Sequence, residues 1–356
     1  MALRILVDTL ADEALTNAQM GNGREIIARL NPEQFHVTTF CLTGPDPRIT
    51  GRPNTRVITL PQRRQTIPIF RQFIAGKHEI LFYVKSSPAA KAYFSLRRLW
   101  RDGRVTIGTV ESQSDWQNEP TIKPEQIRLW RKTVLKCDYL FSNSQSVKRN
   151  LEREFGLASE VVPTGVDARF FSPAWERPSN PRPRILFAGS LRPFKGPQIL
   201  LDAAARFPQA EFVLAGDGVM ASELKERAAR EKLGNVHLLG PLGPEGVREE
   251  YRRADLFLFP SKWEGSPKVI LEAAACGLPV IARNAYEPET VVDGQTGFLV
   301  ANDEELFQRL EGLLSSPGER ARMGRAGRTH AEKFDWDIIT RQWEGIFLRF
   351  CPQRGQ

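Results

Sequence analysis

Cysteines, long apolar runs and cofactor motifs are what this sequence has least of. Its 356 residues include only four cysteines, and no two of them form a CxxC pair. Isolated cysteines are typical of a reducing compartment, and they argue against a disulfide framework or a structural metal site. No apolar stretch reaches the ~18–20 residues of a membrane span, and the first residues indicate a strand rather than a signal peptide. We therefore expect a cytoplasmic protein without a transmembrane segment.

Metal and dinucleotide motifs are missing as well. No HExxH occurs, and in the only Asp-x-Asp pattern, Asp335 and Asp337, we expect the second acid to cap the last helix. The glycines at Gly216 and Gly218 lack the rest of a dinucleotide-binding fingerprint. None of the four histidines lies in a motif. The sequence thus predicts no metal ion, no cofactor and no catalytic histidine.

Charged residues are plentiful but unevenly placed. Residues 1–175 contain 25 Lys and Arg against 17 Asp and Glu, whereas residues 176–356 contain 25 of each. The net charge of +8 therefore lies wholly in the first half. Such an excess predicts an anionic partner or surface for that half. No nucleic-acid-binding motif accompanies it, so we expect no nucleic-acid partner.

Two predicted helices in the first half, over residues 93–101 and 127–136, combine basic and aromatic residues. In the second helix the cations recur at i, i+3, i+4 and i+8, which covers one helical face: Arg128, Arg131, Lys132 and Lys136. Such a face can lie on anionic lipid headgroups. The alternative is an ordinary solvated face with the aromatic rings in the core. Peripheral attachment at the inner membrane face is one expectation.

Alternating strands and helices are the main structural pattern. A chain of this length exceeds one compact core, so two domains are expected. Strands are predicted at 184–188, 211–215, 235–239, 255–259 and 279–282, each followed by a helix, and the first half shows the same alternation, including a strand at 105–110. This pattern predicts an α/β fold with parallel sheets covered on both faces.

Prolines mark the domain boundary. Residues 171–183 hold four prolines, which make a stiff linker. We assign residues 1–170 to an N-terminal domain and 184–335 to a C-terminal domain, and we expect the helix in 336–356 to pack back on the first. Two Rossmann-like domains joined in this way imply a central cleft between their parallel sheets, with ligands at the carboxyl ends of the strands.

Residues 255–282 carry the clearest candidate site. They predict a buried strand, a tight loop with Glu264, a helix with Glu272, and a second buried strand. A glutamate in so apolar a helix is costly to bury without a hydrogen-bonding partner. The amides that open the helix attract an anion: Gly265, Ser266, Lys268 and Val269. Two acceptors beside an anion cradle suit a ligand with sugar hydroxyls and phosphate.

Two candidates in the first half lie at predicted strand ends. Gly21 and Gly23 fall in a predicted polar turn after the first strand, where glycine lets the backbone approach a ligand, unless the loop merely turns. Glu111 follows the strand at 105–110. A carboxylate there can orient or deprotonate a substrate hydroxyl, or it can cap a helix.

Taken in order, several motifs resemble those of the retaining glycosyltransferases of family 4 (glycosyl transferases group 1), which have the GT-B fold. The matching segments are 138–144 and 162–171, Gly189-Ser-Leu-Arg-Pro-Phe-Lys-Gly, Ala215-Gly-Asp-Gly, the paired Glu264 and Glu272, and the closing segment 288–300. Each motif is weak alone, and the ordered set is specific.

The resemblance implies roles for these residues. Lys195 would hold the donor diphosphate and stabilise the leaving charge. Glu264 would contact the donor sugar, Glu272 the ribose hydroxyls, and the amides of Lys268 and Val269 the phosphates. The remaining donor-binding candidates lie in the glycine turns and the helix start: Gly189, Ser190, Gly216, Gly218, Gly265 and Ser266.

Three departures from the family pattern stand out. Ser190 occupies the place where the family often has arginine, and Arg192 is the candidate to supply that cation. Ala285-Tyr286-Glu287 replaces the Gly-Gly that precedes Pro-Glu, and Glu111 stands nearest to the place of a common histidine.

The resemblance therefore implies a metal-independent transferase that moves a sugar from a UDP- or GDP-sugar to a hydroxyl of a glycan, lipid-linked or small-molecule acceptor bound by the first domain. The alternatives are a GT-B-fold sugar-nucleotide epimerase and a non-catalytic sugar-nucleotide-binding subunit.

Overall fold

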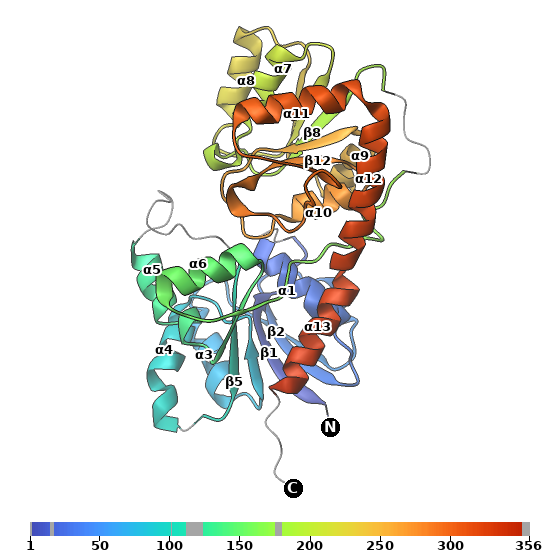
Figure 1. Ribbon diagram of the computed structural model, residues 1–356. Helices are drawn as coiled ribbons and strands as arrows, with labels where there is room; N and C mark the ends of the chain where they lie inside the picture. The colour runs from blue at the N-terminus through green and yellow to red at the C-terminus, as the bar shows by residue number, and fades with distance from the viewer. Residues whose placement is uncertain (1, 15–17, 101, 112–123, 175–179, 351–356) are drawn as a thin grey trace. The chain divides into compact units, whose positions relative to one another are not determined.

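The computed structural model describes residues 2–14, 18–100, 102–111, 124–174 and 180–350 (Figure 1). It divides into two compact units, one of residues 1–163 with 336–356 and one of residues 164–335. The division falls earlier than the predicted linker. Arg328 explains this, because its guanidinium donates to the carbonyls of Ala168 and Phe171 at 2.8 Å and so ties the segment after residue 163 to the second unit.

The first unit is built on a parallel sheet of seven strands in the order β3-β2-β1-β4-β5-β6-β7. Every pair that makes up this order is parallel. The bounds are β1 Leu3–Leu10, β2 Phe35–Cys41, β3 Thr55–Thr59, β4 Ile80–Phe82, β5 Val105–Val110, β6 Tyr139–Ser142 and β7 Glu160–Val161.

Helices cover both faces of this sheet (Figure 1). They are α1 Ala18–Arg29, α2 Pro47–Thr50, α3 Thr66–Ala75, α4 Pro88–Leu96, α5 Pro124–Arg131, α6 Gln145–Phe155 and α13 Trp336–Arg349, with 3-10 turns η1 Arg97–Trp100 and η2 Val134–Lys136. Because side chains alternate along a strand, Ile5 and Val7 are buried in one cluster with residues of α1 and α13, whereas Leu6 is buried in another with residues of α3 and α4.

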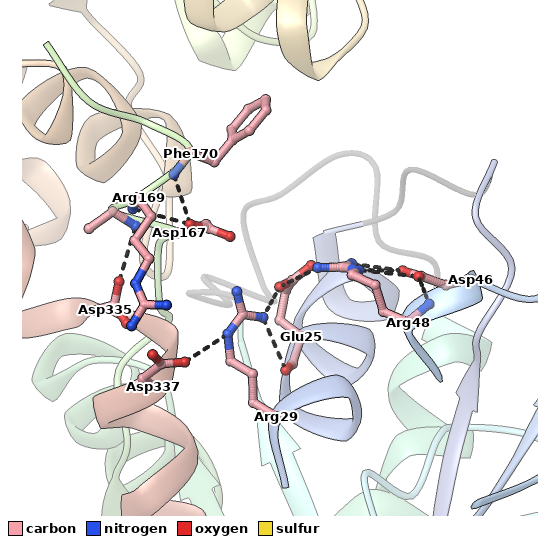
Figure 2. Close-up of polar contacts among 10 residues, drawn as sticks. Glu25, Arg29, Asp46, Arg48, Asp167, Arg169, Phe170, Asp335 and Asp337 are labelled. Carbon is pink, nitrogen blue, oxygen red and sulfur yellow. Dashed lines mark hydrogen bonds and ion pairs between the residues drawn. The ribbon is translucent and has the colours of Figure 1, made fainter. Parts of the chain in front are cut away.

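The terminal helix α13 is part of the first unit. Trp343 and Phe347 pack on Phe82 of β4 with ring centroids 4.7 and 4.9 Å apart. Figure 2 shows Arg29 of α1 held by Asp337 at 3.1 Å and by Glu25 of its own helix. Asp337, in the first turn of α13, therefore pairs with Arg29 of α1. As an acid near a helix N-terminus, it also stabilises α13 through the helix dipole.

The second unit has a parallel sheet of six strands in the order β10-β9-β8-β11-β12-β13. The strands are β8 Arg184–Ala188, β9 Glu211–Ala215, β10 Val236–Gly240, β11 Leu256–Phe259, β12 Val280–Arg283 and β13 Gly297–Val300. Between and after them lie α7 Gln198–Arg206, α8 Ala221–Arg230, α9 Pro244–Arg253, α10 Lys268–Ala275, α11 Asp303–Ser315 and α12 Pro317–Ala331, with 3-10 turns η3 Pro193–Lys195, η4 Asn284–Tyr286 and η5 Glu332–Phe334.

Each sheet reverses its strand order beside its first strand. The chain moves outward from β1 to β3 and then returns to the other side of β1 with β4, and β8 and β11 repeat this arrangement. Ligands of open α/β sheets bind at such switch points, outside the carboxyl ends of the strands. Among the residues that the structure describes, no helix combines the length and apolarity that crossing a bilayer requires.

Candidate active site

Two glycine turns interlock at the carboxyl ends of β8 and β9. Gly189 and Gly216 have φ values of 148° and 145°, a region that side chains disfavour. A Cβ on Gly216 would collide with the carbonyl of Gly189, and one on Gly218 would lie 2.5 Å from the carbonyl oxygen of Leu191. The two loops thus meet backbone to backbone, so glycine is required by packing as well as by conformation.

Lys195 and Glu264 form an ion pair across the switch point between β8 and β11. Lys195 ends the short turn η3, and Gly196 reverses the chain with φ 69°. Glu264 also accepts a 2.6 Å hydrogen bond from the buried hydroxyl of Ser261. The Lys195 ammonium lies 5.3 Å from the ring centroid of Phe259, at the end of β11. A cation and an oriented carboxylate therefore meet where the sheet topology predicts a ligand.

Glu272 of α10 is hydrogen-bonded to a tyrosine from a different helix. The hydroxyl of Tyr251 on α9 donates to Glu272 Oε2 and to the carbonyl of Val269, both at 3.2 Å. Burial raises the pKa of Glu272, against the opposing effects of the Lys268 charge and the Tyr251 hydroxyl. This is the partner that the apolar helix pattern required, and no local signal pointed to Tyr251.

The start of α10 lies directly after the Glu264 loop. Gly265 and Pro267 are buried, and Ser266, Lys268 and Val269 are partly exposed. Pro267 occupies the N-cap position and supplies no side-chain cap. The first turn of α10 therefore combines backbone N–H groups with the positive end of the helix dipole, an arrangement that favours an anion.

The segment that replaces Gly-Gly, residues 285–287, begins within the turn η4 and ends at the residue after it. Glu287 follows it in the left-handed region with φ 46°, a conformation that glycine adopts more easily. Tyr286 is fully buried, and burial followed by the Glu264 charge raises its pKa well above the ordinary range. Tyr286 thus adds a buried phenol to the surroundings of Glu264.

Arg192 is not drawn into this cluster. It is exposed at the start of η3, and its side chain makes no hydrogen bond or ion pair with any described residue. Ser190 accepts a backbone hydrogen bond from Arg192 at 2.9 Å. The structure thus pairs Lys195 with Glu264 and leaves the Arg192 side chain without a partner among the described residues.

In the first unit, a polar cluster surrounds Glu111 at the end of β5. Its carboxylate accepts hydrogen bonds from the hydroxyl of Tyr83 and, at 3.0 Å, from the amide of Asn22. Its carbonyl accepts one from Asn143, also at 3.0 Å. Tyr83 follows β4 with φ 63°, so the chain turns sharply at this switch point. Glu111 is oriented from three different elements.

The glycine prediction in this unit was wrong in its local structure. Gly21 and Gly23 lie buried within α1 rather than in a turn. A Cβ on Gly23 would approach Thr9 to 3.0 Å, which shows that glycine here brings α1 close to β1. The helix thereby carries Asn22 to Glu111, so Gly23 supports the cluster indirectly.

Asp8 and Lys85 lie at the same switch point, and sequence reasoning missed both. The backbone N–H of Lys85 donates to the buried Asp8 carboxylate at 2.9 Å. Burial raises the pKa of Asp8 and lowers that of Lys85, with each charge partly offsetting the effect on the other. Their position near the ends of β1 and β4 was the available signal.

The cations of the two basic helices are of two kinds, because some are paired within the structure and others are exposed to solvent. Arg97 pairs with Asp138 at 2.8 Å and is mostly covered. The cations of the second helix are exposed, while Trp130 is buried in an apolar cluster with Val134 and Val147. In the described part of the chain, no three His, Cys, Asp or Glu residues gather closely enough to hold a metal ion.

Comparison with known proteins identifies the family of this chain. A family model described as glycosyl transferases group 1 matches residues 171–330. The chain is 32% identical over 296 residues to the D-inositol 3-phosphate glycosyltransferase of Corynebacterium jeikeium, an alignment that covers 73% of this chain and 70% of that protein. It is 35% identical over 237 residues, 59% of this chain and 61% of the other, to the GDP-mannose-dependent monoacylated alpha-(1-6)-phosphatidylinositol monomannoside mannosyltransferase of Corynebacterium glutamicum.

Among solved structures, the HepE protein of Anabaena in complex with UDP and glucose superposes with a TM-score of 0.77 at 18% identity, over 98% of this chain and 100% of that one. Together with the two switch-point sheets, this superposition shows that the chain has the GT-B fold. The chain belongs to the group 1 glycosyltransferases, family 4.

Proposed function

We propose that this enzyme is a retaining, metal-independent transferase that moves a sugar from a nucleotide-diphosphate sugar to an acceptor hydroxyl. The Lys195–Glu264 pair at the switch point of the second sheet carries this proposal. When a donor binds, the Lys195 ammonium would contact the diphosphate in place of Glu264. The Glu264 carboxylate would then accept hydrogen bonds from the sugar hydroxyls. Both groups are already positioned, which limits the reorganisation that the transition state requires.

The rest of the donor fits the surrounding residues. The backbone of the glycine turns at Gly189 and Gly216 would lie close to the diphosphate, and the first turn of α10 would stabilise its charge. Glu272, kept in place by Tyr251, would accept hydrogen bonds from ribose hydroxyls. A UDP- or GDP-sugar is the donor class, since one relative is named for GDP-mannose and a structural neighbour was solved with UDP.

In the transfer step, the bond between the sugar's anomeric carbon and the diphosphate oxygen breaks, and a bond from that carbon to the acceptor oxygen forms on the same face. The acceptor's proton passes to the departing phosphate oxygen. Lys195 and the helix amides stabilise the charge that develops on the leaving group without a metal ion.

The acceptor would bind the first unit, where Glu111 would orient its hydroxyl. Acceptors named for the two relatives are inositol 3-phosphate and a phosphatidylinositol mannoside. These names favour a lipid-linked or phosphorylated acceptor here. The exposed cations Arg128, Arg131, Lys132 and Lys136 would support peripheral binding at the inner face of a membrane.

The decisive experiment is turnover of a panel of nucleotide sugars, with and without a membrane lipid extract and with EDTA present. We expect nucleotide release from one UDP- or GDP-sugar, stimulated by the acceptor and insensitive to EDTA, and a product with the anomeric configuration of the donor. Sugar isomerisation without an acceptor would instead indicate an epimerase, and donor binding without any turnover a non-catalytic subunit.

A further inference from the structure

A pocket of about 950 Å³ lies in the first unit at the amino ends of its strands, on the opposite edge of the sheet from Glu111. It is formed by the starts of β1, β2 and β3, by α3 and by the turn before β4. Its described lining includes no carboxylate, and its basic and histidine residues are Arg4, Arg56, Arg71, Lys77, His36 and His78.

The face of the sheet that α3 covers is basic where the strands begin and apolar further along them. Arg4 shares this face with Leu6, and His36 shares it with Phe40, because side chains alternate. Leu6 and Phe40 are fully buried under α3 and α4, whereas Arg4 and His36, paired in register, line the pocket. A sheet covered on both faces normally has apolar strands. At the pocket this face is open to solvent, with His36 exposed and the Arg4 side chain 43% exposed, so its basic side chains are available to an anionic ligand.

The positive charge in the pocket is largely uncompensated. Arg4 has Glu79 at 3.7 Å, but Arg56, Arg71 and Lys77 make no ion pair with any described residue. The buried Nε2 of His78 likewise has no hydrogen-bond partner there. Burial, followed by the charges of Arg104, Arg4 and Arg56, lowers the pKa of His78 to about 4.

We propose that this pocket binds an anion that carries phosphate groups, supplied by the headgroup of an anionic lipid or by a soluble phosphate ester. Guanidinium forks and a lysine are the side chains that recognise phosphate oxygens. The volume suits a headgroup or a sugar phosphate rather than a single ion. Ile67 on α3 is 71% exposed beside the lining residue Pro68, and an exposed apolar side chain at the edge of a basic site favours the lipid source.

The test compares full-length wild type with a pocket variant, Arg71→Glu with Lys77→Glu. The matched control carries the same charge change on exposed residues of α8, Lys225→Glu with Arg230→Glu. Calorimetric titration with inorganic phosphate should show a site that Lys195→Ala and the control retain. The pocket variant should lose about tenfold or more in affinity. Arg56→Gln, on a different wall of the pocket, should give a smaller loss in the same direction.

Vesicles of phosphatidylcholine with and without phosphatidylglycerol distinguish the two sources. A headgroup ligand predicts binding to the anionic vesicles that phosphate competes away and that only the pocket variants lose. A soluble ligand predicts loss of phosphate binding in the pocket variants with vesicle binding equal to that of the control. The inference is overturned if wild type binds neither probe, or if the pocket variants and the control behave alike with both.

Discussion

The hydroxyl of Tyr251 lies 3.2 Å from the carboxylate of Glu272 and donates a hydrogen bond to it. Tyr251 comes from α9 and Glu272 from α10. A residue of one helix therefore fixes the orientation of a carboxylate on the neighbouring helix. If Glu272 binds the donor ribose, then Tyr251 acts as a positioning residue for donor binding.

Replacing Tyr251 with phenylalanine tests that role. The variant keeps the ring and its packing but removes one hydrogen bond, so the KM for the donor should rise by roughly fivefold, which corresponds to about 1 kcal/mol. The kcat should change less. Steady-state kinetics with varied donor measure both constants, and an unchanged KM would remove Tyr251 from donor binding.

Lys195→Ala should reduce turnover by roughly 100-fold or more, because the leaving diphosphate loses its cation. Lys262→Ala is the matched control, since Lys262 lies in the loop that carries Glu264 but is exposed. Nucleotide release and circular dichroism should show an inactive but folded Lys195 variant and an active control. Full turnover by Lys195→Ala would contradict the proposed mechanism.

Gly216→Ala should lower the melting temperature by roughly 5 °C or more, since the new Cβ collides with the backbone of Gly189 at an unfavourable φ. Gly312→Ala provides the opposite case. It lies in α11 with open space around its Cβ position, so alanine should leave stability equal or slightly higher. Thermal melts of both variants check the pair, and equal melting temperatures would refute the packing argument.

Glu111→Gln should lower kcat by about tenfold to 100-fold while donor affinity stays the same, because the amide keeps the shape but not the charge that orients the acceptor. Glu125→Gln, an exposed acid at the start of α5, should have no effect. Donor titration and acceptor kinetics separate the two steps. A loss of donor affinity equal to the loss of kcat would argue against an acceptor role.

The stability of the protein should rise with pH between about 4 and 6.5 through His78. In the folded chain its pKa lies at about 4, below the ordinary value of 6.5. Within this window the unfolded chain binds a proton that the folded chain does not, so acid favours unfolding. His78→Gln should reduce this slope and leave the difference between the variants constant above pH 7. Melting temperatures from pH 4 to 8 measure it, and parallel curves would contradict the prediction.

The strands and the loop motifs were predictable because their signals are local. The strands at 105–110, 184–188 and 211–215 have the predicted bounds, since each is a short apolar run between polar or glycine-containing segments. The placement of Lys195 and Glu264 after two such strands also follows from order along the chain. Parallel alternation then implies that both lie at the same edge of a sheet.

The local structure at Gly21 and Gly23 was not predictable in this way. Glycine near a strand end normally indicates a turn, and here packing against Thr9 selects a helix instead. The partners of the site acids were equally inaccessible. Tyr251 and Glu272 are 21 residues apart, and Tyr83 and Glu111 are 28 apart.

The sequence by itself determined the class of fold, the family and the loops that carry the chemistry, because apolar periodicity and glycine turns act over a few residues. The tertiary structure decided the strand order, and with it which loops meet at each switch point. It also decided that Arg4 and His36 share one face under α3 while Arg192 stays outside the Lys195 cluster. Those outcomes depend on register and helix packing, which act between residues that are distant along the chain.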